Sequence, residues 1–288
     1  MEDFNWERDA IGFYERFHYV FLSCAVLYYP TIFGIRHYLQ DKEPFDFGGA
    51  PVTIRDAGGK PIKDARNKIQ RQPSKALFNY IFWWELGLAI FSILGAYNVV
   101  PLAYKSYVEN DSFVEAVCKQ GLESSDARYW WIFVFNVSKV FEFGDTLFVV
   151  LRKKPLILLQ HYHHLATMLY CWWGTLVVAS LNNTNPFFAA MNLCVHSVMY
   201  SWYAATRTGW RSPKWMMMCV TLIQLVQMIA GCYIVMMAQQ DHDNCVWKKE
   251  DPLGSMAASF MYFSYLVLFS NLFYQNYCKK KDKKKKLA

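Results

Sequence analysis

The stretch PLILLQHYHHLATMLYCWWGTLVVAS, residues 155–180, places three histidines inside an apolar segment that is long enough to cross a membrane. Ionisable side chains at membrane depth cost about 2.5 to 3.5 kcal/mol for the charged types, so they usually serve a function. Gln160, His163 and His164 share one helical face, because positions i, i+3 and i+4 are neighbours, whereas His161 points elsewhere. Imidazole can act as a base, a nucleophile or a metal ligand. This face is therefore a candidate site; the alternative is a set of hydrogen-bonded residues that lock helices together.

Seven apolar segments of about 20 residues have the length of membrane spans. They cover residues 17–39, 77–99, 129–151, 155–180, 186–205, 213–237 and 253–277. The sequence therefore predicts an all-α, polytopic membrane protein that forms a single domain over residues 1–288, with seven transmembrane helices. Residues 40–76 are rich in Gly and Pro and are predicted to form a polar loop, and residues 278–288 a basic tail.

The distribution of positive charge predicts the orientation. Of the 30 Lys and Arg residues, 22 fall in residues 40–76, 152–154, 206–212 and 278–288 with their flanks. These segments lie on one side of a seven-span protein, and cytosolic segments carry the excess of Lys and Arg. We therefore expect a lumenal or external N-terminus and a cytosolic C-terminus. The last four residues, KKLA, resemble a dilysine signal for retrieval to the endoplasmic reticulum.

Two of the eight cysteines lie in predicted loops rather than in spans. Cys118 precedes the third span and Cys245 precedes the seventh, and the charge distribution places both loops on the lumenal side. An oxidising lumen allows them to form a disulfide. Two unrelated free thiols are the alternative that the residues leave open.

Polar residues recur in three other predicted spans. The members of these clusters are Lys139, Glu142, Asp145 and Thr146; Asn192, His196, Met199, Tyr200 and Tyr203; and Thr221, Gln224 and Gln227. Within the first cluster, Lys139 and Glu142 have the spacing of a structural ion pair, which is the alternative to a direct role in a site. Four clusters that face one bundle interior, the histidines included, predict an enclosed polar site.

These clusters resemble, in order and spacing, the motifs of the ELO/ELOVL family of very-long-chain fatty acid elongases. Lys139 to Thr146 match a Lys-Glu-Asp-Thr motif, Gln160 to His164 a His-x-x-His-His box, His196 to Tyr200 a His-x-x-Met-Tyr box, and Thr221 to Gln227 a Thr-x-x-Gln-x-x-Gln element. The sequence around them, including Gly231-Cys232, looks most like the branch that acts on saturated and monounsaturated chains. Gln160 departs from the histidine of the box, and its amide does not titrate.

The resemblance implies a condensing enzyme with an acyl tunnel. It would join a long-chain acyl-CoA with malonyl-CoA and give a 3-ketoacyl-CoA two carbons longer, carbon dioxide and CoA. It implies His163 as the nucleophile, His196 as a base or orienting partner, and His164 as a positioning or polarising group. The other residues expected at the substrate are Lys139, Glu142, Asp145, Thr146, Gln160, Asn192, Met199, Tyr200, Tyr203, Gln224 and Gln227. Arg152, Lys153, Arg207 and Lys214 are expected to bind the CoA phosphates.

The resemblance also implies the setting of the enzyme. It favours the Cys118–Cys245 disulfide, the endoplasmic reticulum membrane, contacts with membrane lipid and with other enzymes of the elongation cycle, and neither a metal, a further cofactor nor nucleic acid. A membrane di-iron desaturase or hydroxylase is the main alternative, but it generally needs about eight histidines as ligands, and this chain has 7. A seven-span receptor or transporter is the alternative from another class; a transporter would show matching halves with broken helices, which the sequence lacks.

Overall fold

Helices form nearly all of the chain that the structure describes. The structure is a computed structural model that describes residues 4–42, 52–53, 60–61, 71–72, 75–118, 128–177, 184–240 and 245–279. In chain order the helices are η1 (Trp6–Ile11), α1 (Gly12–Tyr38), α2 (Lys75–Val108), α3 (Phe113–Cys118), α4 (Tyr129–Phe141), α5 (Phe143–Leu151), α6 (Leu158–Val177), α7 (Thr184–Arg207), α8 (Lys214–Gln240), α9 (Val246–Glu250), α10 (Pro252–Phe273) and η2 (Tyr274–Cys278). Each of the seven predicted spans therefore contains at least one helix.

Four of these helices are long and apolar enough to cross a membrane. They are the helical segments Trp6–Tyr38, Ala76–Val108, Lys214–Gln240 and Pro252–Cys278. Their outer faces expose large apolar side chains such as Tyr97, Val226 and Phe260, which suits contact with lipid. The chain is therefore a multi-pass membrane protein.

The described part of the chain is all-helical in architecture, as predicted, and the structure adds two local details. The predicted loop 40–76 contains a small antiparallel pair of two-residue strands, β1 (Val52–Thr53) and β2 (Arg71–Gln72). Most other residues of this loop, and tail residues 280–288, lie outside the described part. The predicted third span is divided at Glu142 into α4 and α5. The backbone tightens there, because the Asp145 N–H bonds to the carbonyl of Glu142, only three residues earlier.

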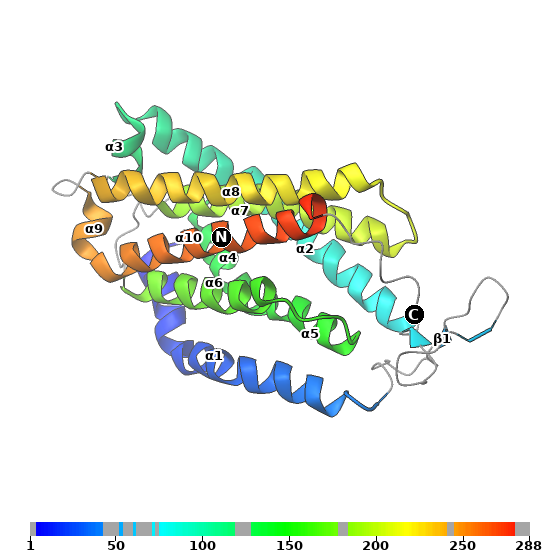
Figure 1. Cartoon of the computed structure of the whole chain (residues 1–288). Helices are drawn as coiled ribbons and strands as arrows, with labels where there is room; N and C mark the ends of the chain where they lie inside the picture. Colours follow the sequence, from blue (N-terminus) through cyan, green and yellow to red (C-terminus); the bar gives the residue numbers. More distant parts are fainter. Residues whose placement is uncertain are drawn as a thin grey trace.

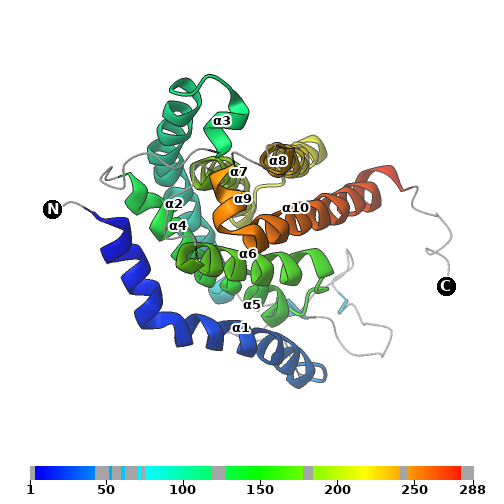
Figure 2. The same cartoon turned by 90° about the vertical axis from the view of Figure 1, so that its left-hand side faces the viewer.

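The long helices run side by side, with α1 at the edge of the bundle (Figure 1). Helices α3 and α9 lie at one end, and β1 lies toward the other. Seen from the first end, α9 crosses the middle of the bundle in front of α10 (Figure 2). Its neighbour α10 begins with a local capping arrangement, in which Asp251 accepts a bond from Gly254 N and Pro252 follows the cap.

Candidate active site

A cavity of about 430 Å³ lies inside the bundle, within the range of small-molecule sites. Helices α2, α5, α6, α7, α8 and α10 contribute to its wall. All four predicted clusters reach it, through Glu142, Asp145, Gln160, His163, His164, Asn192, His196, Met199, Tyr200, Tyr203, Thr221, Gln224 and Gln227. The structure thus places side chains from four separate segments around one partly open cavity, whose wall combines polar and apolar residues.

Four side chains behind and along this wall form a closed polar network. The ammonium of Lys139 donates to Glu142 Oε1 at 2.6 Å and to Asn192 Oδ1 at 2.9 Å. Asn192 Nδ2 lies 3.2 Å from His196 Nε2, and His196 Nδ1 lies 3.7 Å from Glu142 Oε1. The Lys139 side chain is 1% exposed and does not line the cavity, so it acts on the site through Glu142 and Asn192. The positive charge of Lys139 compensates the negative charge of Glu142 in the interior of the bundle.

A second set of hydrogen bonds holds Asp145. Trp84 Nε1 of α2 donates to Asp145 Oδ1 at 2.8 Å, and the Tyr200 hydroxyl of α7 donates to Asp145 Oδ2 at 2.6 Å. The Trp84 ring fits against Gly144, where a Cβ would overlap it. The Asp145 carboxylate therefore links α2, α5 and α7. The hydroxyl proton of Tyr200 is already used in this hydrogen bond.

The histidines divide between two faces of α6. His163 and His164 line the cavity together with Gln160. Among the described residues no group hydrogen-bonds to the ring of His163, and Nδ1 of His164 is buried without a partner. His161 instead packs between the rings of Tyr29 and Phe33 of α1, as its place on the helix predicts.

The other predicted residues make contacts that hold the helices around the cavity together. Gln224 Nε2 donates to the Met199 sulfur at 3.0 Å. Thr146 does not line the cavity; it accepts a hydrogen bond from the Tyr28 hydroxyl at 2.9 Å and so fastens α5 to α1.

The four predicted phosphate-binding cations lie in different places. Arg152 and Arg207 line the cavity, but Arg207 forms a two-pronged ion pair with Glu85, with bonds of 2.9 and 2.7 Å. Lys153 donates to the carbonyls of Gln40 and Lys42 after α1. Lys214 is exposed and away from the cavity wall.

Sequence reasoning missed Trp84 and Glu85, which both line the cavity. Glu85 carries a signal that could have been used, because a carboxylate inside a predicted span needs a partner or a function. Trp84 carries no such signal, since tryptophan is common in membrane helices and only the fold brings it to Asp145.

A smaller cavity of about 60 Å³ continues from the first toward the α9 end. The two share His163, Asn192, Gln227 and Met228. His163 therefore stands where the two spaces meet.

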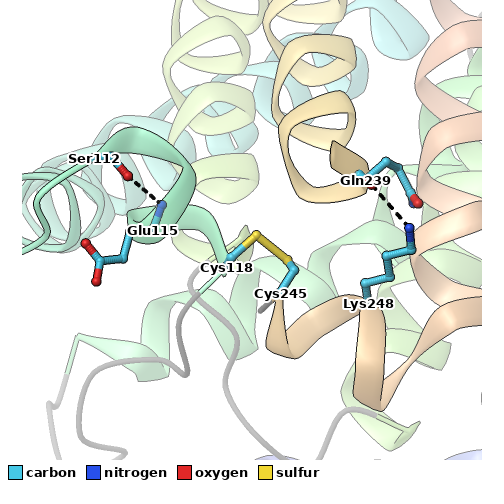
Figure 3. Close-up of a disulfide and its surroundings, with 6 residues drawn as sticks. All are labelled: Ser112, Glu115, Cys118, Gln239, Cys245 and Lys248. Atoms are coloured by element: carbon cyan, nitrogen blue, oxygen red, sulfur yellow. Dashed lines mark hydrogen bonds between the residues drawn. A yellow bond between two sulfur atoms is a disulfide. The ribbon is translucent and has the colours of Figure 1, made fainter. Parts of the chain in front are cut away.

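The α9 end of the bundle is cross-linked (Figure 3). A disulfide joins Cys118, the last residue of α3, to Cys245, which precedes α9. Beside it, the Ser112 hydroxyl accepts a bond from Glu115 N, and Lys248 Nζ donates to the carbonyl of Gln239. The first bond caps the start of α3, and the second ties α9 to the end of α8.

Known proteins resemble this chain over most of its length. Human very long chain fatty acid elongase 6 is 35% identical over 229 residues, 78% of this chain and 81% of the relative. The Drosophila melanogaster protein of the same name is 32% identical over 280 residues, 96% of this chain and 77% of the relative. A putative fatty acid elongase 3 of Caenorhabditis elegans is 38% identical over 220 residues, 72% of this chain and 66% of the relative.

The family comparison covers nearly the whole chain and agrees with the motifs. Within the described residues, no group of three or more His, Cys, Asp or Glu is arranged to hold a metal ion. The family comparison gives no support to the desaturase, receptor or transporter alternatives. Residues 13–285 match the family described as ELO, the GNS1/SUR4 family, and the chain belongs to this family of fatty acid elongases.

Proposed function

We propose that His163 carries the acyl group while this elongase joins it to a malonyl unit. Family membership makes the chain a condensing enzyme of fatty acid elongation, an acyltransferase that acts on acyl-CoA and malonyl-CoA. The observation that carries the proposal is the place of His163 at the junction of the two cavities. A group held there can extend into one cavity while the other receives the second substrate.

The proposed reaction has two steps. First, a ring nitrogen of His163 attacks the thioester carbonyl, the carbon–sulfur bond breaks, and CoA leaves as a thiol after taking the imidazole proton. Second, malonyl-CoA loses carbon dioxide, and its carbanion attacks the acyl carbon. The carbon–nitrogen bond to His163 then breaks, and the imidazolate that leaves takes a proton from solvent, giving 3-ketoacyl-CoA and the neutral imidazole. Since both substrates supply every atom of the product, we propose that no further cofactor takes part.

The network around His196 is proposed to position the malonyl unit. Glu142, Asn192 and His196 all reach the cavity, and the hydrogen bond between Asn192 and His196 orients the His196 ring, whose Nδ1 lies 3.7 Å from the Glu142 carboxylate. Tyr200 was expected at the substrate, but its hydroxyl donates its proton to Asp145. We therefore assign Tyr200 a positioning role and propose that His164 polarises the acyl carbonyl.

The CoA groups are proposed to lie at the Arg152 and Arg207 side of the cavity. Arg152 is the better candidate for the phosphates, because its guanidinium makes only one bond, from Nε to the Phe148 carbonyl at 3.2 Å. A phosphate at Arg207 would compete with Glu85. Lys153 and Lys214 are away from the cavity wall, so the proposal does not include them.

We propose seven spans in the endoplasmic reticulum membrane, with the N-terminus in the lumen and the C-terminus in the cytosol. The charge bias, the dilysine pattern and the disulfide at the end opposite β1 support this arrangement. A tag after Ala288 should be open to protease in sealed microsomes, and protection of that tag would contradict the orientation. Other enzymes of the elongation cycle are proposed partners.

The acyl intermediate gives the most direct test of the mechanism. Incubation with acyl-CoA in the absence of malonyl-CoA should leave one acyl mass on the peptide that contains His163. The matched control is His161→Ala, which keeps the site face intact and should still be labelled. An acyl group on a cysteine, with elongation intact, would overturn the histidine mechanism and leave the elongase function in place.

A further inference from the structure

The second cavity follows one face of α6 away from His163. Thr167, Cys171 and Gly174 line it at spacings of four, four and three residues. With a rise of 1.5 Å per residue, the helix advances about 16 Å between His163 and Gly174. An extended alkyl chain, with bonds of about 1.5 Å in a zigzag, advances roughly 1.25 Å per carbon. The distance along α6 from His163 to Gly174 therefore equals the length of about 13 carbons, and the cavity of about 60 Å³ has to widen by side-chain movement to take a chain of that length.

The far end of this cavity has a fixed floor. Trp247 of α9 lines it, is 1% exposed, and packs edge-on to Phe188 with ring centroids 6.1 Å apart. Helix α9 lies across the end of the bundle (Figure 2). Trp247 is two residues from Cys245, and the disulfide to Cys118 holds this segment against α3. The floor is thus anchored covalently.

Gly174 lines the second cavity, and no packing contact of the described residues explains why this position is a glycine. A glycine inside a helix is unfavourable relative to alanine, so it needs an explanation. At Gly144 and Gly231 the explanation is close packing, because a Cβ there would overlap Trp84 or Tyr262. At Gly174 no described atom lies within 4 Å of an added Cβ, and the backbone has no positive φ. The glycine leaves open space in a cavity wall.

We propose that Gly174 is a specificity-determining residue that sets the longest acyl chain this elongase accepts. Its missing side chain keeps the cavity open above the Trp247 floor, so that the methyl end of the chain can reach it. This inference rests on the proposed function, since it assumes that the acyl chain on His163 enters the second cavity. It identifies the ligand of the Gly174 space as the terminal part of a saturated alkyl chain.

The test is a chain-length profile of Gly174→Ala, Gly174→Val and Gly174→Leu. Each variant, in microsomes, is given labelled malonyl-CoA and a series of saturated acyl-CoA primers that differ by two carbons. Larger side chains should lower the longest primer accepted, with kcat/KM falling about tenfold for each two carbons excluded, since each buried methylene contributes about 0.8 kcal/mol. Shorter primers should keep their wild-type rates. Gly174→Ala should not lower thermal stability, because alanine favours the helix.

Gly34→Val is the matched control. Gly34 also lies inside a long helix with nothing within 4 Å of an added Cβ, but it lies on α1 and lines neither cavity. Its profile should equal that of the wild type.

Trp247→Leu should change the profile in the opposite direction, by extending the longest primer accepted. Because Trp247 is a core residue, Trp247→Phe provides a milder change if the first variant does not fold. A uniform loss of activity across all primers in the Gly174 series, with the same length limit, would overturn the proposal. A wild-type protein that elongates no primer would instead contradict the proposed function.

Discussion

His196 and His163 both lie at the centre of the bundle, but they differ in the hydrogen bonds that their rings form. His196 belongs to the closed network with Lys139, Glu142 and Asn192, whereas the ring of His163 has no hydrogen-bond partner among the described residues. Buried polar groups are normally paired, so a free imidazole at a cavity junction is available for chemistry. An imidazole that is held by a neighbouring amide and lies beside a carboxylate, as His196 does, is better suited to holding a geometry. The contrast separates the residue that we propose to react from those that orient it.

Loss of the free histidine should have the largest effect on activity. His163→Ala removes the proposed nucleophile and should abolish elongation. Thermal stability should fall only modestly, because the change removes the packing of the ring on Tyr265 but, among the described residues, no hydrogen bond of the ring. The measurement is incorporation of labelled malonyl-CoA into longer acyl chains in microsomes. Turnover near the wild-type rate in His163→Ala would contradict the mechanism.

Loss of the cation from the closed network should mainly affect stability. Lys139→Met leaves the carboxylate of Glu142, which is 3% exposed, without its partner, and should cost about 3–5 kcal/mol of unfolding free energy. The measurement is the thermal transition of the purified protein in detergent.

The double variant Lys139→Met with Glu142→Gln separates charge from geometry. Removal of both charges of a buried pair is often neutral, so most of the stability should return. The elongation activity of the double variant should nevertheless be low, because His196 lacks the neighbouring side chains that order its ring. Additive losses of stability in the double variant would show that the two side chains do not act as a pair.

The same contrast explains what the sequence predicted and what it did not. The helical spacing of Gln160, His163 and His164 placed all three on one cavity wall, because i, i+3 and i+4 neighbours are set by local geometry alone. The Lys139–Glu142 pair was predictable for the same reason. The bond from Trp84 to Asp145 spans 61 residues, and no local pattern encodes it. The ion pair of Arg207 with Glu85 also depends on the packing of α2 against α7.

Some helix boundaries could be predicted from the sequence and others could not. Apolar segments located the long helices, because burial in lipid or in a core demands long apolar stretches. The break at Glu142 could not be read from them, because the i, i+3 spacing of Lys139, Glu142 and Asp145 also fits one continuous helix. The short helices α3 and α9 were also missed, because five or six residues are too few to show a period.

A smaller effect is expected from the bond that holds Asp145. Tyr200→Phe keeps the ring but leaves one buried carboxylate oxygen without its donor, which should cost about 1–3 kcal/mol of stability. If Tyr200 only positions Asp145, kcat should fall modestly and KM for malonyl-CoA should change little. Trp84→Phe removes the other donor to the same carboxylate and is the matched comparison. A complete loss of activity in Tyr200→Phe alone would instead indicate that the hydroxyl touches the reacting atoms.

The smallest effect should come from the histidine on the outer face of α6. His161 Nδ1 lies 3.4 Å from the Tyr29 hydroxyl, a long contact, and the ring packs edge-on to Tyr29 and Phe33 rather than lining the cavity. His161→Ala should therefore change the unfolding free energy by less than about 1 kcal/mol and leave elongation within roughly twofold of wild type. Both variants remove one histidine from α6, but from different faces. A comparison of His161→Ala with His163→Ala in the same microsomal assay therefore shows whether the position of the lost histidine determines the effect on elongation. Equal losses in the two variants would mean that α6 presents a different face to the substrate, and the distinction between free and packed histidines would fail.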